Sequence, residues 1–322
     1  MIHLTINSKN IFVLLGSFSL TFFLIRLTMP IFKKFLLDIP SRRSSHIISK
    51  PRGYGIIFVF VGIISCLFYS EYSLLLLIPL TITGFIDDKY NISSKVRYLI
   101  QLITVSWILI ITQYGNNFYK LFSTDYLLIN LFVFIFLIIL FTAIINFINF
   151  MDGIDGLVAG CMLILIIIKV FLSYDFLLGF VGSLIAFLLW NWSPSKIFMG
   201  DSGSTALGTL FVLMLTKNNQ YDEILGFFLI GTPLFADALF CLLRRLKNRQ
   251  NVFTPHKLHL YQRLNQGGLS HQSVSILYIF ATSLLGFIWL LFQNSLLMIY
   301  LSLTFILVGF WLDKNKAKPF ES

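Results

Sequence analysis

Residues 127–157 read LLINLFVFIFLIILFTAIINFINFMDGIDGL and change character along their length. The first two thirds are mostly apolar and match the length of about 20 residues that a membrane-spanning helix needs. Asn146, Asn149 and Asp152 then recur every three residues, which places them on one broad face of a helix, and Asp155 follows at the same interval. A helix cap accounts for one such side chain but not for four. We therefore predict that a membrane span ends here in a functional site.

The whole chain has the composition of an integral membrane protein. Its 322 residues are 57% hydrophobic and 12% charged, whereas a soluble domain carries about 25% charged residues. This excludes a cytosolic enzyme, a secreted disulfide scaffold and a disordered protein. The net charge of +10 does not indicate a nucleic-acid partner, because basic residues in membrane proteins mostly set topology. The three cysteines lie in apolar runs, so we expect neither a disulfide framework nor a cysteine-based zinc site.

Apolar runs of suitable length predict an all-α polytopic bundle of about eleven transmembrane helices, in one domain spanning 1–322, with its active site on cytoplasmic loops. The predicted spans are 11–31, 55–70, 72–86, 97–113, 127–147, 156–173, 175–191, 204–216, 224–243, 273–292 and 295–312.

Lysine and arginine set the predicted orientation. If successive loops lie on alternate sides of the membrane, 19 of the 24 basic residues fall on the loops of one side. The positive-inside rule makes that set cytoplasmic, with the N-terminus outside and the C-terminus inside. The same set also holds most of the acidic clusters and histidines, as one cytoplasmic active site would require: Asp87, Asp88, Asp152, Asp155, Asp201, His46, His256, His259 and His271.

Two carboxylate motifs accompany the 127–157 stretch. Asp87 and Asp88 are adjacent at the end of a predicted span, where burial requires a compensating cation or proton, although solvated loop aspartates explain them equally well. The string Gly-Asp-Ser-Gly-Ser at 200–204 precedes another span, and such a helix N-terminus presents N–H groups to anions. Asp201 in that string would repel a bare phosphate, so a divalent cation is the expected intermediary, and a plain helix cap is the alternative.

The basic loop 244–272 contains His256-Lys-Leu-His259-Leu-Tyr-Gln-Arg263. His-x-x-His can ligate zinc, but the motif lacks an accompanying glutamate, and histidine with lysine and arginine suits a nucleotide diphosphate. A positive-inside loop with incidental histidines is the alternative. The loop 38–55 is similarly basic, and it suits either a lipid phosphate or a purely topogenic role. Asp237 and Arg26 are charges inside predicted spans, which are functional by default unless paired.

These motifs, in this order and spacing, resemble the polyprenyl-phosphate N-acetylhexosamine-1-phosphate transferase superfamily, glycosyltransferase family 4. The resemblance covers roughly 36–272. It implies transfer of a sugar 1-phosphate from a UDP-sugar to undecaprenyl phosphate, which releases UMP and leaves a polyprenyl diphosphate sugar. It also implies dependence on Mg²⁺, with Mn²⁺ as a substitute, and a place in the bacterial inner membrane. A homodimer is left open.

The resemblance also implies roles for individual residues. Asp87 and Asp88 match a catalytic aspartate pair, the first of which is assigned to deprotonate the lipid phosphate, and Asn149 and Asp201 match positions that bind Mg²⁺. Asp152 and Asp155 match catalytic positions in the segment that lines the nucleotide and metal site. The residues implied in substrate binding are Asn146, His256, His259 and Arg263.

The sequence departs from one branch of the superfamily. The peptidoglycan translocase has three consecutive histidines where this chain has His256-Lys-Leu-His259, which argues against a MurNAc-pentapeptide substrate. The stretch His-Leu-Tyr-Gln-Arg-Leu looks most like the branch that initiates O-antigen chains with UDP-GlcNAc or a 6-deoxy-N-acetylhexosamine. Whether the lipid phosphate attacks directly or an aspartate forms a covalent intermediate stays open.

Two other functions fit part of the pattern. A membrane transporter with a cytoplasmic metal or anion site would have many helices and intramembrane charge, but transporter sites lie near the bilayer midplane, whereas these carboxylates gather at one surface. A CDP-alcohol phosphotransferase is also a membrane Mg²⁺ enzyme. Its Asp-Gly-x-x-Ala-Arg stretch is absent, because Ile-Asp-Gly follows Asp152-Gly.

Overall fold

The computed structural model describes residues 7–40, 48–112, 127–217, 220–252, 254 and 256–320. Of the loop 38–55, the predicted anion-binding residues Arg42, Arg43 and His46 lie outside these ranges. The described chain is helical apart from a two-residue antiparallel pairing of Leu37–Asp38 (β1) with Lys50–Pro51 (β2). This confirms the prediction of an all-α protein.

The helices follow one another along the chain with short connections. They are α1 (Ser8–Phe35), α2 (Gly55–Leu67), η1 (Ser73–Leu77), α3 (Ile78–Tyr90), α4 (Ser94–Ile111), α6 (Leu127–Phe150), α7 (Leu157–Phe171), η2 (Asp175–Leu177), α8 (Leu178–Asn191), α9 (Gly200–Thr216), α10 (Tyr221–Ile230), α11 (Thr232–Lys247), α12 (Leu260–Gln266), α13 (His271–Phe292) and α14 (Ser295–Asn315).

The structure supports a membrane-spanning bundle but does not confirm eleven spans. A helix overlaps each of the eleven predicted ranges. Within the described residues, however, only α1, α4, α6, α13 and α14 are long and apolar enough to cross a membrane, and α10 with α11 adds a sixth if this pair, bent by 73°, is one span. Helices such as α2, α7 and α8 are apolar but shorter than the roughly 20 residues that a span needs. The count of eleven therefore stays a prediction.

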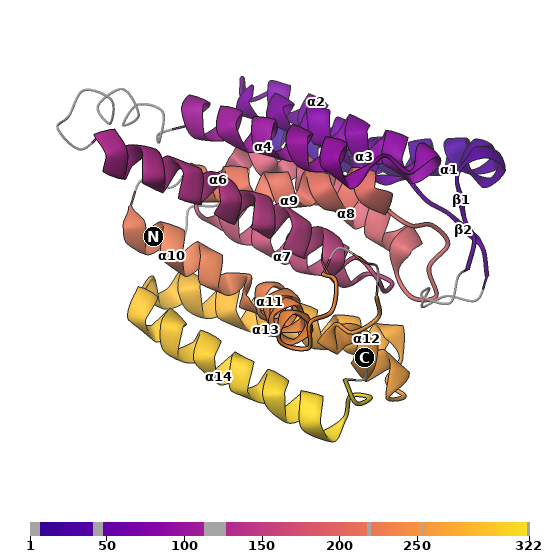
Figure 1. The fold of residues 1–322 in the computed structure, drawn as a ribbon. Helices are drawn as coiled ribbons and strands as arrows, with labels where there is room; N and C mark the ends of the chain where they lie inside the picture. The colour runs from indigo at the N-terminus through magenta and orange to yellow at the C-terminus, as the bar shows by residue number, and fades with distance from the viewer. Residues whose placement is uncertain are drawn as a thin grey trace.

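The bundle has two chemically different ends. Figure 1 shows β1, β2 and α12 at one end of the bundle. Polar contacts join residues that the charge pattern assigned to the same set of loops: Asn10 Nδ2 donates to Asp175 Oδ2 at 2.9 Å, and Lys217 pairs with Glu71 at 2.7 Å. At the other end, Lys50 lies 3.8 Å from Asp155. The fold thus gathers the predicted inner loops at one end.

Helix α9 occupies the centre of the bundle, with residues 202–216 all buried. It packs against α2, α3 and α6. Glycines allow its first turn to approach two neighbours: a Cβ on Gly55 of α2 would lie 2.0 Å from the Gly203 nitrogen, and one on Gly84 of α3 would lie 2.4 Å from the Asp201 carbonyl carbon. The backbones of α2 and α3 therefore lie directly against the backbone of the first turn of α9.

We expect Gly84→Ala to disrupt the site, because its methyl group would overlap the backbone of Asp201 and push α3 away from α9. The transferase activity that the family resemblance implies should fall by more than tenfold, while the protein still inserts into the membrane. Gly309→Ala in α14 is the matched control, since the nearest atom to its added Cβ would be 3.8 Å away. Equal activity of the two variants in detergent-solubilised protein would contradict this account of the packing.

Candidate active site

A cavity of about 330 Å³ opens between α3, α4, α6, α9 and the loop before α12. Its polar lining includes five of the residues predicted from the sequence, and these are Asn146, Asn149, Asp201, His256 and His259. They come from three separate parts of the chain, so the fold brings the predicted motifs together in one place. Arg97, Gln101 and Gln262 complete much of the polar wall.

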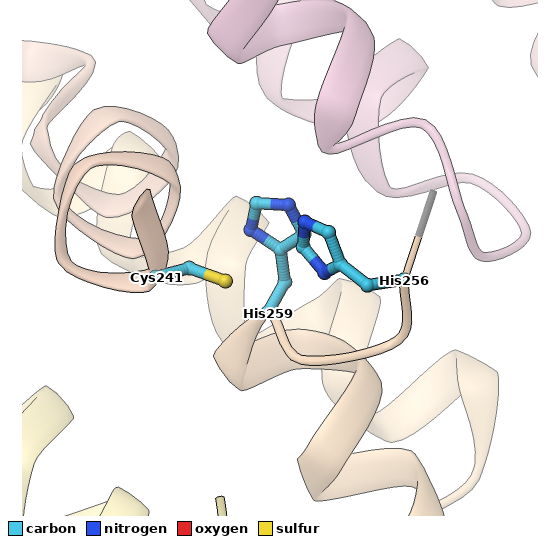
Figure 2. Close-up of side chains that lie close together, drawn as sticks. All are labelled: Cys241, His256 and His259. Atoms are coloured by element: carbon cyan, nitrogen blue, oxygen red, sulfur yellow. The ribbon is translucent and has the colours of Figure 1, made fainter. Parts of the chain in front are cut away.

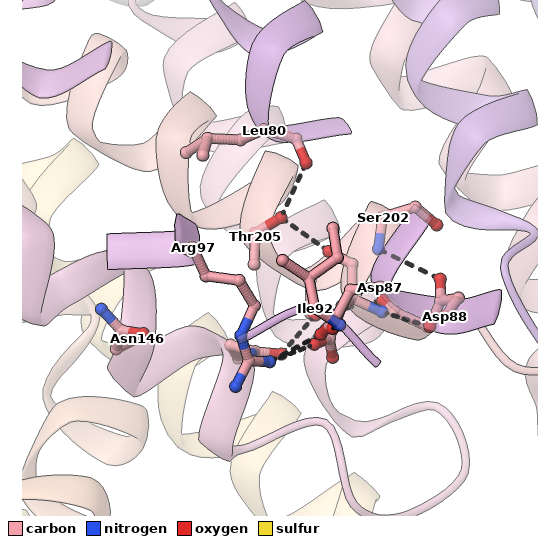
Figure 3. Close-up of polar contacts among 12 residues, drawn as sticks. Leu80, Asp87, Asp88, Ile92, Arg97, Asn146, Ser202 and Thr205 are labelled. Atoms are coloured by element: carbon pink, nitrogen blue, oxygen red, sulfur yellow. Dashed lines mark hydrogen bonds and ion pairs between the residues drawn. The ribbon is translucent and has the colours of Figure 1, made fainter. Parts of the chain in front are cut away.

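Arg97 joins two of the acidic motifs. Its Nη1 donates to Asp87 Oδ2 at 2.7 Å and to Asp201 Oδ2 at 2.9 Å, as Figure 3 shows. Asp87 also accepts the Ile92 N–H at 2.6 Å, which closes the end of α3. Asp87 is buried, whereas about a third of the Asp201 side chain is exposed to the cavity. One positive charge therefore serves two carboxylates, of which Asp201 lines the cavity and Asp87 is not among the lining residues.

Asp88 has a different environment from its neighbour. Its carboxylate accepts the N–H groups of Asp201 at 3.0 Å and Ser202 at 3.3 Å, so it caps the N-terminus of α9 (Figure 3). Arg52 Nε lies 3.7 Å from Asp88 Oδ1 and donates to the main-chain oxygen of Asp88 at 2.9 Å. The anion that the Gly-Asp-Ser-Gly-Ser turn binds is therefore a side chain of this protein. A catalytic role for Asp88 stays a prediction, since its contacts are those of a buried cap.

The two asparagines of α6 face the cavity from one side. Asn146 Nδ2 donates to Gln101 Oε1 and to the Thr142 carbonyl, both at 2.8 Å. One turn later, Asn149 Oδ1 accepts the Ser204 hydroxyl at 2.6 Å. Ser204 lies in the first turn of α9, so Asn149 ties α6 to the helix that carries Asp201.

Asp152 and Asp155 follow α6 in a turn and differ in their contacts. Asp155 is buried: its carboxylate accepts the Ser195 N–H and hydroxyl at 3.1 and 2.7 Å and lies 3.4 Å from His271 Nδ1. Burial opposes its ionisation, but the hydrogen bonds from His271 and Ser195 lower the pKa of Asp155 to about 2. These contacts hold the turn in place, and a catalytic role for Asp155 stays a prediction.

Asp152 lacks such partners within the described part of the chain. Burial raises the pKa of Asp152 well above its usual range, and the negative charges of Asp201, Asp88 and Asp155 raise it further. The turn that carries Asp152 is held by α12, because the Tyr261 hydroxyl donates to the Phe150 carbonyl at 3.0 Å. Asp152 is thus the carboxylate whose charge is least compensated.

The histidine loop is held by Asp237 of α11. This carboxylate accepts the N–H groups of Leu260 and Tyr261 at 2.7 and 2.9 Å, and it also accepts the Tyr278 hydroxyl at 2.7 Å. The intramembrane charge singled out in the sequence is therefore paired, and it positions His259, whose Nδ1 lies 3.6 Å from Asp237 Oδ1.

The two histidine rings stack with their centroids 5.0 Å apart. Burial lowers the pKa of His256 to about 4, and the nearby positive charges of His259 and Arg245 contribute. At neutral pH His256 is therefore an uncharged hydrogen-bonding group rather than a cation.

Arg263 does not share the surroundings of the histidines. Its guanidinium is buried, donates to the main-chain oxygens of Leu258 at 3.2 Å and Lys318 at 2.8 Å, and pairs with Asp313. It is not among the residues that line the cavity. These contacts attach the histidine loop to the C-terminal segment, so the structure offers Arg263 a positioning role in place of the predicted contact with substrate.

The donor set of the cavity fits a divalent cation. Asp87 and Asp201 already direct carboxylate oxygens at one cationic atom, Arg97 Nη1, and Asn149 adds an amide oxygen nearby. Carboxylates and amide oxygens are the ligands that Mg²⁺ prefers in proteins. The raised pKa of Asp152 also favours a bound cation at this site. It reflects a cluster in which negative charge exceeds the positive charge supplied by the described side chains.

Sequence reasoning missed Arg97 and Gln101. Arg97 was counted only as a topogenic cation, and Gln101 lies inside a predicted span. Neither residue belongs to one of the motifs, so the motifs gave no direct signal for them. A glutamine within an apolar run four residues after an arginine was the one available hint, because it places both side chains on the same helix face.

We expect Arg263→Ala to lower stability rather than substrate affinity. Removing one partner of a buried ion pair costs on the order of 3 kcal/mol. The melting temperature of the detergent-solubilised protein should fall, while the KM for the sugar donor of the folded fraction stays unchanged. Lys247→Ala, at an exposed cation on α11, is the control. A raised KM with an unchanged melting temperature would restore Arg263 to the substrate site.

Comparison with known proteins identifies the family of the chain. Residues 71–218 match the family described as glycosyl transferase family 4. The chain is 32% identical to a probable undecaprenyl-phosphate N-acetylglucosaminyl 1-phosphate transferase of Bacillus subtilis (strain 168), over 88% of this chain and 87% of the relative. It is 28% identical to the decaprenyl-phosphate N-acetylglucosaminephosphotransferase of Mycobacterium leprae (strain TN), over 74% and 72% of the two chains.

A third relative is the undecaprenyl-phosphate alpha-N-acetylglucosaminyl 1-phosphate transferase of Escherichia coli (strain K12), which is 25% identical over 73% of this chain and 70% of the relative. These relatives are phospho-sugar transferases that use polyprenyl phosphates, and their similarity extends over most of the chain. The chain therefore belongs to glycosyl transferase family 4, within the polyprenyl-phosphate N-acetylhexosamine-1-phosphate transferase superfamily that its motifs resemble.

Proposed function

We propose that this protein transfers N-acetylhexosamine 1-phosphate from a UDP-sugar to undecaprenyl phosphate. The observation that carries the proposal is the single cavity in which Asp201, the amides of Asn146 and Asn149, and His256 with His259 converge at one end of an apolar bundle. UDP-GlcNAc is the first donor to assay, because the relatives are named for N-acetylglucosamine. The initiation of O-antigen chains remains the prediction made from residues 259–264.

The reaction joins two anions, so the site must offset charge and align the reactants. An oxygen of the lipid phosphate bonds to the phosphorus that carries the sugar, and the bond from that phosphorus to UMP breaks, its electron pair leaving with UMP. Asp87, at the end of α3, is suited to take a proton from the lipid phosphate. The neutral ring of His256 and the adjacent ring of His259 are suited to hydrogen-bond the diphosphate or the sugar.

Asp201 and Asn149 would hold Mg²⁺, with Asp87 and Asp152 close enough in the cluster to share its charge. When bound, the ion would neutralise negative charge on the diphosphate and on the leaving UMP. Arg97, which lines the cavity, gives Asp87 and Asp201 a shared cationic partner and so holds the two carboxylates close to each other.

The charge pattern supports a cytoplasmic position for this end of the bundle. The donor is a soluble nucleotide sugar, and the acceptor phosphate lies at the membrane surface, so a site at the bundle end meets both reactants. We place the protein in the bacterial inner membrane with its N-terminus outside and its C-terminus inside. The transporter alternative loses support from the position of the cavity, because it lies at one end of the bundle, and from the names of the relatives.

Metal dependence follows from the carboxylate cluster. Chelation by EDTA should abolish activity, and added Mg²⁺ or Mn²⁺ should restore it. Asp201→Asn should reduce activity by at least a hundredfold while the protein inserts and melts normally, since the amide keeps the shape of the side chain and loses its charge. UMP release from UDP-GlcNAc and undecaprenyl phosphate is the assay. Full turnover in EDTA without added metal would overturn the metal assignment.

Steady-state kinetics should distinguish residues that bind the donor from residues that act in the chemical step. Loss of a group that grips the donor in both ground and transition states mainly raises KM, whereas loss of a group acting in the chemical step lowers kcat. We expect His259→Ala to raise KM for the UDP-sugar and Asp87→Asn to lower kcat at saturating substrates. Each substrate is varied in turn, and unchanged KM and kcat in His259→Ala would remove this loop from the donor site.

A further inference from the structure

Cys241, His256 and His259 form a cluster in which the proposed reaction gives the Cys241 thiol no role. Cys241 lies on α11, His256 in the following loop and His259 immediately before α12. One potential ligand atom from each residue lies within 4.8 Å of the other two. Figure 2 shows the thiol directed toward the two stacked imidazole rings. The sequence analysis set aside zinc at His256 and His259 for lack of a glutamate, and it expected no zinc site at Cys241 because this cysteine lies in an apolar run.

We propose that these three residues form a binding site for Zn²⁺, separate from the carboxylate cluster. One thiolate and two imidazoles are donors that zinc prefers, and three protein ligands leave a fourth tetrahedral position for water. Tetrahedral zinc with these bond lengths holds its ligand atoms about 3.5 Å apart, so the atoms need to approach by roughly 1 Å. The His256–His259 loop supplies that movement more readily than α11.

His259 is already prepared as a ligand. Its side chain is 5% exposed, and its Nδ1 has no hydrogen-bond partner among the described residues. Asp237, one turn before Cys241 on the same face of α11, places a carboxylate oxygen 3.6 Å from that nitrogen. A carboxylate beside a metal-binding histidine orients the ring and increases its basicity.

Two features of the site work against the metal and set its affinity. His256 Nδ1 accepts the Leu258 N–H at 3.2 Å, so ligation through Nε2 shifts the ring proton to Nδ1 and ends this hydrogen bond. The charge of Arg245 lies nearby, although its guanidinium donates to the carbonyls of Val252 and Thr254. The thiol of Cys241 releases its proton to solvent when the metal binds.

Binding has a consequence for activity that rests on the proposed function. His256 and His259 also line the cavity, so zinc would withdraw both rings from the nucleotide sugar. Zn²⁺ should then inhibit the transferase through a site that Mg²⁺, which prefers oxygen ligands, does not occupy.

Cobalt is a spectroscopic probe for the site. The full-length protein in detergent, freed of metal by chelation, is titrated with Co²⁺, which should give a thiolate charge-transfer band and the visible spectrum of tetrahedral cobalt. Zn²⁺ should then displace Co²⁺ and abolish both spectral signals. Cys241→Ser should lose the thiolate band, whereas Cys161→Ser, which removes a buried thiol on α7, should keep it. Absence of the band in the unaltered protein, or its persistence in Cys241→Ser, overturns the proposal.

Inhibition is measured separately, at saturating Mg²⁺. Cys241→Ser should retain activity, because the thiol is outside the cavity lining, and should need on the order of tenfold more Zn²⁺ for half-inhibition. Equal sensitivity of the two proteins would overturn the link to activity, since zinc would then be acting at the carboxylates. The cobalt spectrum does not depend on turnover, so it tests the metal site even if the proposed reaction is wrong.

Discussion

The contact between the Asp88 carboxylate and the first N–H groups of α9 determines how the rest of the site is arranged. A helix that begins inside a membrane protein leaves backbone donors that water cannot reach, and each unsatisfied donor is costly. Asp88 accepts two of them, and its negative charge is favourable at the positive end of the helix. Because Asp88 belongs to α3 and the donors belong to α9, this contact fixes the two helices to each other. Asp87 and Asp201 consequently lie on either side of Arg97.

This contact is sterically possible only with glycine at several positions. Gly200 has φ of +71°, and a Cβ there would lie 2.3 Å from Asp88 Oδ2. Gly84 and Gly203 allow the neighbouring backbones to meet, as described above for the start of α9. The glycine-rich motif thus serves a different purpose from a phosphate-binding turn. It lets a carboxylate of the protein take the place that a substrate anion would occupy.

The sequence predicted where the helices lie and which motifs meet, and it predicted individual roles less well. Hydropathy identifies apolar helices without a structure, which is why every predicted range overlaps a helix. It does not distinguish a span from a short interior helix such as α2, because both are apolar throughout. The convergence of Asn149, Asp201 and His259 was predictable from charge topology, since all three were assigned to one surface.

Roles depend on partners that are distant in sequence. Asp87 and Asp88 are adjacent and chemically identical, yet one faces Arg97 and the other caps α9. Arg97 was counted only as a topogenic cation and Arg263 was implied in substrate binding, but Arg97 borders the cavity and Arg263 is buried against the C-terminal segment. Only the tertiary contacts show which role each of these residues has.

The charges of the cluster can be compared one by one. Asp88 is offset by Arg52 and the helix N-terminus, Asp155 by Lys50, and Asp87 and Asp201 share Arg97. Asp152 has no cationic partner among the described side chains. The five carboxylates therefore exceed the three cations by two negative charges, which is the charge of one divalent ion. Without a metal ion, bound protons must offset this excess negative charge, and for this reason the pKa of Asp152 is raised. A diphosphate substrate adds further negative charge, so the cluster is suited to receive its substrate together with a divalent cation rather than alone.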